Sequence, residues 1–566
     1  MYCTMNKARY NPSEKVFCQL ADIPAGSAQI TASLTHLHKV IMYINISIDS
    51  DQADLAIVLP NNDYTGYLLC LEARDTDGKS LAVSFTGVDC SSDWTHFPRY
   101  GYVWDFTASA NPEEKLGILN RCHINALQFY DWQYRHHQPL APDLSGWRDW
   151  SGRMIDGSTL RAYLDHAHKH GISCMAYNMI YAANMTYKGD GSGVDSSWRL
   201  VREAGGDFTC NMDASMGDTG ILQYFNPLNP DWQKYIFEKE NEIFAQLPFD
   251  GWHGDTIGEN GPMTRDDGSP LGYDGNGKPI HRVKDCYRMF LDAAKNAIGD
   301  KYLAFNPVGA QGIEQVYQSK VDILYAEFWP WDRNTEGEPY ETYSSLQREI
   351  IRAWELGRHK SLVVAAYVNY RNPSPLFNAP AVRLLDSVVF SSGGARLELG
   401  NGGHMLSDEY FPSDHKKRMD PELQAAVQRM YDFITAYENI LRDGHKPVCR
   451  KVLADEYEVS ENGLADTIWC FSKADTGHEV IHFINLVGTD NEWRDTQQTK
   501  KAPALLHDLH IRLYTDFAVQ SVSLASPDDP DISLRELDYA TETNLEGRCI
   551  LFDIPSLAYW DMILLR

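Results

Sequence analysis

Two carboxylate residues, Asp255 and Glu327, each close an apolar run and stand within three positions of a tryptophan, in Trp252-His253-Gly254-Asp255 and in Glu327-Phe328-Trp329. Sugars offer hydroxyl groups to carboxylates and apolar C–H faces to aromatic rings. Cleaving a glycosidic bond takes two carboxyl groups, because one protonates the leaving oxygen while the other attacks the anomeric carbon or activates water. The pattern therefore predicts a glycosidase.

Polar side chains also end the other strand-like runs in the middle of the chain. The eight runs are 102–106, 126–130, 173–179, 251–256, 302–305, 323–328, 362–368 and 387–398. Their polar ends are Asp105, Asp131, Asn178, Asp255, Asn306, Glu327, Asn369 and Glu398. Because a (β/α)8 barrel builds its active site at the carboxyl ends of its strands, we expect these side chains to converge on one face.

Amphipathic, helix-like segments separate these runs, at 112–121, 160–170, 232–246, 284–298 and 344–356. Eight strand-plus-helix units in about 350 residues predict an α/β protein with a (β/α)8 (TIM) barrel. A doubly wound sheet is the alternative, but no Gly-rich phosphate turn follows the first run.

All-β patterns flank this region on both sides, with short strand-like runs separated by turn residues. The sequence therefore predicts an N-terminal Ig-like β-sandwich over 1–95, the barrel over 96–440 and an antiparallel β-sandwich over 441–566. We expect the two β-domains to brace the barrel.

Composition limits the partners and the compartment. The 566 residues carry a net charge of −27, which disfavours nucleic acid and membrane surfaces but not a neutral ligand. Eleven scattered cysteines without a C-x-x-C pair argue against a disulfide framework or a zinc ribbon. Residues 1–16 lack the features of a secretory signal, so the chain is expected to be cytoplasmic, or an exported protein already stripped of its signal.

A metal site is not expected. His166, His168 and His170 share a predicted helix, but no H-E-x-x-H pattern includes them, and a solvated helix end explains them better. A carboxylate pair needs neither a metal nor another cofactor.

Four longer segments add a family resemblance. Residues 123–140, 249–258, 322–329 and 393–406 closely resemble segments of glycoside hydrolase family 66, which includes dextranases and cycloisomaltooligosaccharide glucanotransferases. The likeness extends over residues 95–415, and the flanking β-domains suit the family's layout.

The resemblance implies a retaining, endo-acting enzyme on α-1,6-linked glucan, with dextran and isomaltooligosaccharides as its ligands. By the family's pattern Asp255 is expected to be the nucleophile and Glu327 the general acid and base. Tyr130, Asp131 and Trp132 would lie near the cleaved bond. The other implied sugar-binding residues are Asn178, Trp252, His253, Trp329, Asn369, Glu398 and His404.

Hydrolases and cyclising transferases of the family share this machinery, and the transferases typically carry a carbohydrate-binding module inserted late in the barrel. Only 17 residues, 370–386, separate the seventh and eighth predicted strands, too few for a domain. This favours a dextranase over a cyclising transferase. A non-catalytic α-glucan-binding protein is a third reading, against which the presence of both carboxylates weighs.

Overall fold

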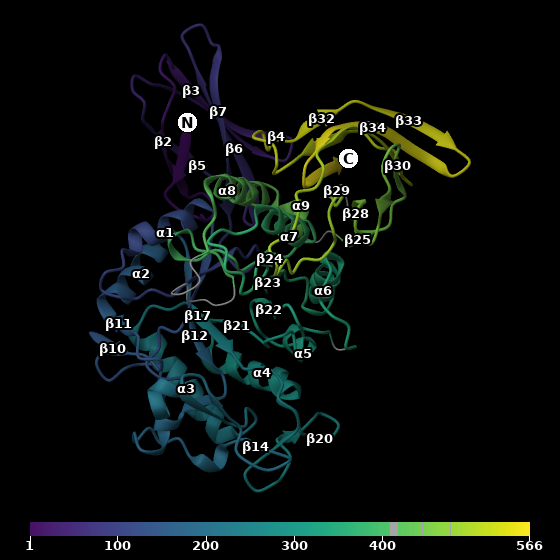
Figure 1. Ribbon diagram of the computed structural model, residues 1–566. Helices are drawn as coiled ribbons and strands as arrows, with labels where there is room; N and C mark the ends of the chain where they lie inside the picture. The colour runs from purple at the N-terminus through teal and green to yellow at the C-terminus, as the bar shows by residue number, and fades with distance from the viewer. Residues whose placement is uncertain (335, 408–416, 444–445, 476) are drawn as a thin grey trace.

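Eight parallel strands form the centre of the protein in the computed structural model, which describes residues 1–566 except 335, 408–416, 444–445 and 476 (Figure 1). Five pair in the order β21-β17-β12-β9-β8 and three in the order β22-β23-β24. Isolated parallel bridges, Ala304 to Ile323 and Tyr102 to Gly400, lie where the two sheets meet. The strands are β8 (Tyr100–Val103), β9 (Ala126–Phe129), β12 (Ser173–Met179), β17 (Gly251–Asp255), β21 (Tyr302–Phe305), β22 (Leu324–Phe328), β23 (Leu362–Ala366) and β24 (Ala395–Arg396).

The α/β class and the order of the strands agree with the sequence, but two expectations differ. The ladders make two sheets, not the one closed sheet of a complete barrel. The predicted strand over 387–398 is also wrong in its first half, because residues up to Ser391 belong to helix α7. Val388, Val389 and Phe390 resemble a strand because α7 is buried around most of its surface and so has no polar stripe.

Helices cover the outer side of the parallel strands, and polar N-caps start many of them. Asn111, Asp156, Asn229, Thr342 and Asp420 each accept a hydrogen bond from a first-turn N–H group. The helices are α1 (Pro112–Arg121), α2 (Gly157–Lys169), α3 (Pro230–Gln246), α4 (Tyr287–Ile298), α5 (Ile313–Tyr317), α6 (Tyr343–Leu356), α7 (Ala379–Ser391), α8 (Pro421–Ala436) and α9 (Glu438–Arg442). None of the described helices is long and apolar enough to cross a membrane.

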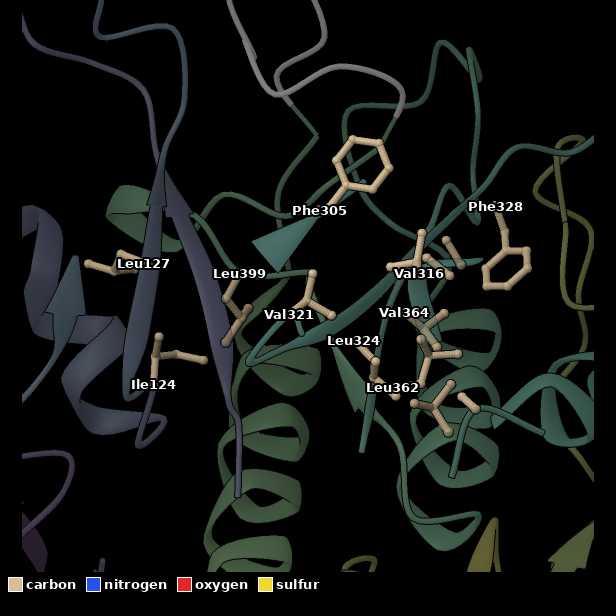
Figure 2. Packing of buried hydrophobic residues seen from close by; sticks show 14 of the residues in the cluster. Ile124, Leu127, Phe305, Val316, Val321, Leu324, Phe328, Leu362, Val364 and Leu399 are labelled. Atoms are coloured by element: carbon tan, nitrogen blue, oxygen red, sulfur yellow. The ribbon is translucent and has the colours of Figure 1, made fainter. Parts of the chain in front are cut away.

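The parallel strands bury both faces. Figure 2 shows Leu324, Phe328 and Val364 in the apolar layer on one side of β22 and β23, which belongs to the main hydrophobic core. Residues of the other parity, such as Tyr325, Val363 and Tyr367, form a separate inner cluster with residues from β8, β12 and β21. Because side chains alternate along a strand, this parity decides which residues can face a central site.

Long excursions follow several strands. The connections after β9, β12 and β17 contain β10 (Gly146–Arg148), β11 (Met154–Asp156), β13 (Ala182–Asn184), β14 (Val201–Arg202), β15 (Thr209–Asn211), β16 (Ile221–Tyr224), β18 (Met263–Thr264), β19 (Gly272–Tyr273) and β20 (Pro279–Ile280). Strand β14 pairs with β18, which ties the second excursion to the third. These segments all leave the carboxyl ends of the parallel strands.

The N-terminal strands form two antiparallel sheets, β1-β2-β5 and β4-β3-β6-β7, around their own apolar cluster. They are β1 (Tyr2–Met5), β2 (Lys15–Ala21), β3 (Gln29–His36), β4 (Lys39–Ser47), β5 (Ala53–Val58), β6 (Thr65–Arg74) and β7 (Ser80–Cys90). Helix α8 packs directly on β6 and β7 (Figure 1). A Cβ atom at Gly87 would lie 2.6 Å from the carbonyl oxygen of Asp432, so this close approach requires glycine.

The Asp432 side chain links three parts of the chain. It accepts hydrogen bonds from the Thr86 hydroxyl at 2.7 Å and the Gly87 N–H at 3.0 Å, and its Oδ1 lies 2.7 Å from Nε2 of His123. Asp432, Thr86 and His123 are all buried. The N-terminal sheet, α8 and the segment before β9 therefore share one polar contact.

The C-terminal strands form two further sheets around a third cluster. One has the order β25-β28-β29-β35-β31-β32, with β27 pairing β28, and the other has the order β26-β30-β34-β33. They are β25 (Lys446–Val448), β26 (Val452–Ala454), β27 (Val459–Ser460), β28 (Ile468–Ala474), β29 (Glu479–Asn485), β30 (Leu506–Tyr514), β31 (Val522–Ala525), β32 (Arg535–Leu537), β33 (Tyr539–Asn544), β34 (Gly547–Leu557) and β35 (Trp560–Leu565).

Candidate active site

Asp255 is the last residue of β17 and lies partly buried at its carboxyl end. Its Oδ2 accepts a hydrogen bond of 2.5 Å from the Tyr177 hydroxyl, on the neighbouring strand β12. Its buried Oδ1 has no hydrogen-bond partner among the described residues. One oxygen of this carboxyl group is therefore held in place, and the other is free to react.

Glu327 lies in β22 and is 4 % exposed. The Asn306 amide donates to its Oε2 at 3.0 Å, and the Tyr367 hydroxyl donates to its Oε1. Asn306 follows β21 and Tyr367 follows β23, so both neighbouring strands orient this carboxyl group.

The two carboxyl groups influence each other. Burial, and next the charge of Glu327, raise the pKa of Asp255 to about 8, although the hydrogen bond from Tyr177 lowers it. Burial also raises the pKa of Glu327, although its hydrogen bonds from Asn306 and Tyr367 lower it. Two buried, mutually repelling carboxyl groups hold a proton between them near neutral pH.

An aromatic stack extends outward from Glu327. The rings of Tyr367 and Trp329 are stacked with centroids 4.0 Å apart, and those of Trp329 and Trp331 are stacked at 5.4 Å. Tyr370 meets both tryptophans edge-on. Trp331 is 59 % exposed, so the stack runs from the buried acid to the surface.

Tyr130 and His253 complete the inner surface. The Tyr130 ring lies 4.5 Å from the Tyr177 ring, and Tyr177 holds Asp255. His253 is two residues before Asp255 on the same face, and its Nδ1 lies 2.9 Å from the Tyr100 hydroxyl. Burial lowers the pKa of His253 to about 3, so its ring is neutral.

Asp131 lies next to this surface but is already paired. Arg153 donates to its Oδ2 at 2.7 Å and also bonds Asp149 at 2.6 Å. Asp131 has a φ of 48°, the left-handed region, so the backbone turns sharply directly after Tyr130.

Four of the predicted sugar-binding residues face away from the two carboxyl groups. Trp132 packs on Phe249 and Trp147, and Trp252 packs between Phe237 and Phe290. Asn178 bonds Glu240 at 2.9 Å and the His136 carbonyl at 2.9 Å, and Glu398 pairs with Arg396 and Tyr431. All four are at most 1 % exposed, so the structure does not bring them to the carboxylate pair.

The last two predicted residues lie in the surroundings of the site. Asn369 is fully buried, and its amide donates to the carbonyl and side-chain oxygens of Asp495, at 2.8 and 3.0 Å. It therefore supports a segment of the C-terminal region. His404 is partly buried and lies edge-on to Trp104, with ring centroids 6.2 Å apart.

Sequence reasoning missed Tyr177, Tyr367, Trp331 and Tyr370, and it noted Asn306 only as a strand end. The alternation of side chains along β12 could have identified Tyr177. It lies two residues after Met175, which faces inward, and so it points to the same side of the strand. The polar residue at the end of each run attracted attention instead of the tyrosine beside it.

A possible group of metal ligands lies at the opposite ends of the strands. Atoms of His168, Cys174 and Asp250 lie within 4.8 Å of one another. The His168 ring bonds Asp250 at 2.8 Å, and the Cys174 N–H donates to the same carboxylate oxygen at 2.7 Å. Local hydrogen bonding accounts for this cluster.

Replacing Tyr367 by Phe tests how Glu327 is held. The hydroxyl stabilises the ionised carboxylate, so its loss raises the pKa of Glu327, and the basic limb of the pH–activity profile moves to higher pH. We expect kcat to fall roughly tenfold, since one hydrogen bond to a charged group is worth about 1.5–3 kcal/mol. Tyr317→Phe is the matched control, because Tyr317 donates to the buried Glu349 outside the site at 2.8 Å. Equal pH profiles for the two variants would contradict this role.

Two carboxyl groups beside aromatic rings are the groups with which enzymes cleave glycosidic bonds. The chain belongs to glycosyl hydrolase family 66, whose sequence model matches residues 5–564. This confirms the resemblance found in the four sequence segments.

Curated relatives represent two activities. A cycloisomaltooligosaccharide glucanotransferase of Niallia circulans is 25 % identical over 721 residues, covering 99 % of this chain and 71 % of that protein. A dextranase of Streptococcus salivarius is 27 % identical over 575 residues, covering 90 % of this chain and 68 % of that protein. The crystal structure of a Paenibacillus cycloisomaltooligosaccharide glucanotransferase, complexed with cycloisomaltoheptaose, matches with a TM-score of 0.88 at 24 % identity and covers 100 % of this chain and 99 % of that one. That likeness supports the multidomain fold.

Proposed function

We propose that this protein is a retaining endo-hydrolase of α-1,6-linked glucan, a dextranase, with Asp255 as nucleophile and Glu327 as general acid and base. The observation that carries the proposal is the pairing of these two groups. They come from separate strands, each is oriented by tyrosine or amide donors, and the charge of Glu327 raises the pKa of Asp255.

The proposed reaction has two displacements. In the first, Asp255 Oδ1 attacks the anomeric carbon while Glu327 protonates the departing glycosidic oxygen, leaving a glycosyl ester and a shortened chain. In the second, the Glu327 carboxylate takes a proton from water, and the water oxygen displaces Asp255 from the sugar. Retention predicts carboxyl groups about 5–5.5 Å apart.

The first displacement requires the shared proton to lie on Glu327. Reaction requires Asp255 ionised and Glu327 protonated. The repulsion that raises the pKa of Asp255 disappears once Glu327 carries the proton, so moving the proton to Glu327 favours the ionised nucleophile. At neutral pH the raised pKa of Asp255 keeps the proton on Asp255 in the free pair, so this proton moves to Glu327 before the first displacement.

The surroundings of the pair suit a neutral, hydroxyl-rich polymer. Trp329, Trp331 and Tyr130 offer ring faces and edges, and His253 and Asp131 add polar groups close by. The net charge of −27 does not oppose an uncharged glucan. Trp132, Trp252, Asn178 and Glu398 would support the site from the outer side of the parallel strands.

Hydrolysis rather than cyclisation is favoured by one short connection and by the lengths of two sequence alignments. Only residues 367–378 separate β23 from α7, which leaves no room for an inserted module. The alignment with the glucanotransferase spans 721 positions against 566 residues here, so at least 155 of its positions (721 less 566) have no counterpart in this chain. The alignment with the dextranase spans 575.

Incubation with dextran, followed by separation of linear from cyclic products, tests the proposal. We expect linear isomaltooligosaccharides and a rapid fall in viscosity, because cleavage is internal. Cyclic products as the main outcome would identify a cyclising transferase. Binding without new reducing ends would identify a glucan-binding protein.

We further propose that the two parallel sheets work as one (β/α)8 barrel joined at the bridges Ala304–Ile323 and Tyr102–Gly400. The division into 1–95, 96–440 and 441–566 follows from it. The separate apolar clusters of the N-terminal and C-terminal sheets support this division, while the main core also takes in C-terminal residues such as Trp469, Trp493 and Trp560.

A further inference from the structure

A segment of the C-terminal region reaches the carboxyl ends of β22 and β23. Residues 486–505 connect β29 to β30. Arg494 donates to the Pro330 carbonyl at 2.9 Å, and the Trp493 indole donates to the Tyr340 carbonyl at 2.6 Å. Asp495 receives the amide of Asn369. The segment therefore contacts the loop that follows Glu327, as well as the residues that follow β23.

Hydrogen bonds and buried side chains fix the conformation of this segment. The Asp495 carboxylate accepts the N–H groups of Thr499 at 2.7 Å and Lys500 at 2.9 Å. The Lys500 side chain is 2 % exposed and pairs with Asp490, and Trp493 is fully buried. A loop held in this way does not have to be ordered when a ligand binds, which lowers the entropic cost of binding.

The segment and Pro330 enclose an open cavity of about 540 Å³. Two of its three acidic groups are paired, since Asp490 pairs with Lys500 and Glu492 lies 3.2 Å from Arg494, and the third, Asp495, accepts N–H groups of its own segment. The side chains of Thr496, Gln497 and Thr499 also line it and make no hydrogen bond within the described part of the chain. The lining carries one net negative charge and offers hydroxyl and amide groups, which suits an uncharged, hydroxyl-rich ligand better than an anion.

Pro330 connects the cavity to the aromatic stack, although none of the stacked rings lines the cavity itself. Pro330 stands between Trp329 and Trp331 in the sequence, and its Cα is three residues, at most about 11 Å, from that of Glu327. Tyr367, Trp329 and Trp331 form a continuous set of stacked rings from Glu327 toward the surface. A single oligosaccharide can therefore contact both the carboxylate pair and the cavity.

We propose that this cavity is an outer glucan-binding subsite, which holds distant glucose units of the same chain that is cleaved at Asp255 and Glu327. The C-terminal region thereby contributes to substrate binding in addition to bracing the parallel strands. The inference rests on the proposed function, because it assumes that the ligand of the carboxylate pair is a glucan.

The test compares substrates of different length. In the double variant Gln497→Ala/Thr499→Val, we expect kcat/KM to be unchanged for the shortest isomaltooligosaccharides that are cleaved. Beyond the length at which the substrate reaches the cavity it should fall about five- to tenfold, since each lost hydrogen bond is worth about 0.5–1.5 kcal/mol. Gln520→Ala/Thr543→Val changes the same residue types on exposed positions elsewhere in the C-terminal region and should leave every value unchanged.

The outcomes separate the two proposals. A ratio of variant to wild type that is the same at every length overturns the subsite and leaves the dextranase proposal intact. A wild-type protein that neither cleaves nor binds any of these oligosaccharides overturns both. The single variants Gln497→Ala and Thr499→Val give the same readout if the double variant is unstable.

Discussion

We expect replacement of Asp255 by Ala to lower dextran turnover by roughly 10⁴-fold or more, because in the proposed mechanism the Asp255 carboxylate forms the glycosyl ester. Within the described part of the chain the Asp255 side chain accepts one side-chain hydrogen bond, from Tyr177, so its removal should leave the unfolding midpoint nearly unchanged. Release of reducing ends from dextran measures turnover, and circular dichroism measures folding.

The Asp255→Ala variant also allows a test of the role itself. With an α-isomaltosyl fluoride and added azide, the small anion should take the place of the missing carboxylate and give a glycosyl azide of inverted configuration. Dextran turnover that stays within tenfold of the wild-type value would show that Asp255 is not the nucleophile.

Replacing Glu327 by Gln has the second large effect, and it depends on the leaving group. Dextran turnover should fall by about 10²–10⁴-fold, since its glycosidic oxygen needs a proton to depart. Formation of the glycosyl ester from α-isomaltosyl fluoride should persist, because fluoride departs without needing a proton. Azide should then accelerate turnover and give a product of retained configuration.

The pH dependence of the Glu327→Gln variant has a definite sign. The charge of Glu327 is one reason why the pKa of Asp255 is about 8, so removing that charge lowers the pKa of Asp255. The acidic limb for fluoride cleavage should therefore lie at a lower pH than 8. Glu349→Gln is the matched control, because Glu349 is buried and accepts hydrogen bonds from two tyrosines outside the site. Equal losses on dextran and on the fluoride would contradict the assignment of Glu327 as the acid.

Much of the fold could be predicted because its periodicities are local. The alternation of strand-like and helix-like segments was sufficient for seven of the parallel strands. It failed at α7, where a helix with no polar stripe looks like a strand. Where the two parallel sheets meet, at the bridges Ala304 to Ile323 and Tyr102 to Gly400, depends on contacts between separate segments, and no local pattern carries that information.

The candidate site, too, could be predicted in part from the sequence. Asp255 and Glu327 were identifiable because both chemistry and family motifs select them. Trp252 was included because it stands close to Asp255 in the same motif, and Glu398 because it ends the eighth predicted run, although adjacent residues of a strand point to opposite faces. Trp252 neighbours His253, which faces inward, and so packs against helices instead. The partners Tyr177 and Tyr367 were missed because a hydrogen bond between strands leaves no trace in either strand alone.

The contact at Asp432 limits how this protein could be dissected. Its carboxylate is buried and accepts hydrogen bonds from Thr86 and Gly87 of the N-terminal sheet. It also contacts the imidazole ring of His123. A shortened chain that begins after residue 95 would lose two of these donors and uncover the face of α8 that packs on β6 and β7, and the lost hydrogen bonds and apolar burial destabilise a protein by several kcal/mol. The N-terminal sheets therefore cannot be removed without destabilising the rest of the protein. A chimera with different N-terminal sheets would have to reproduce the positions of Thr86 and Gly87.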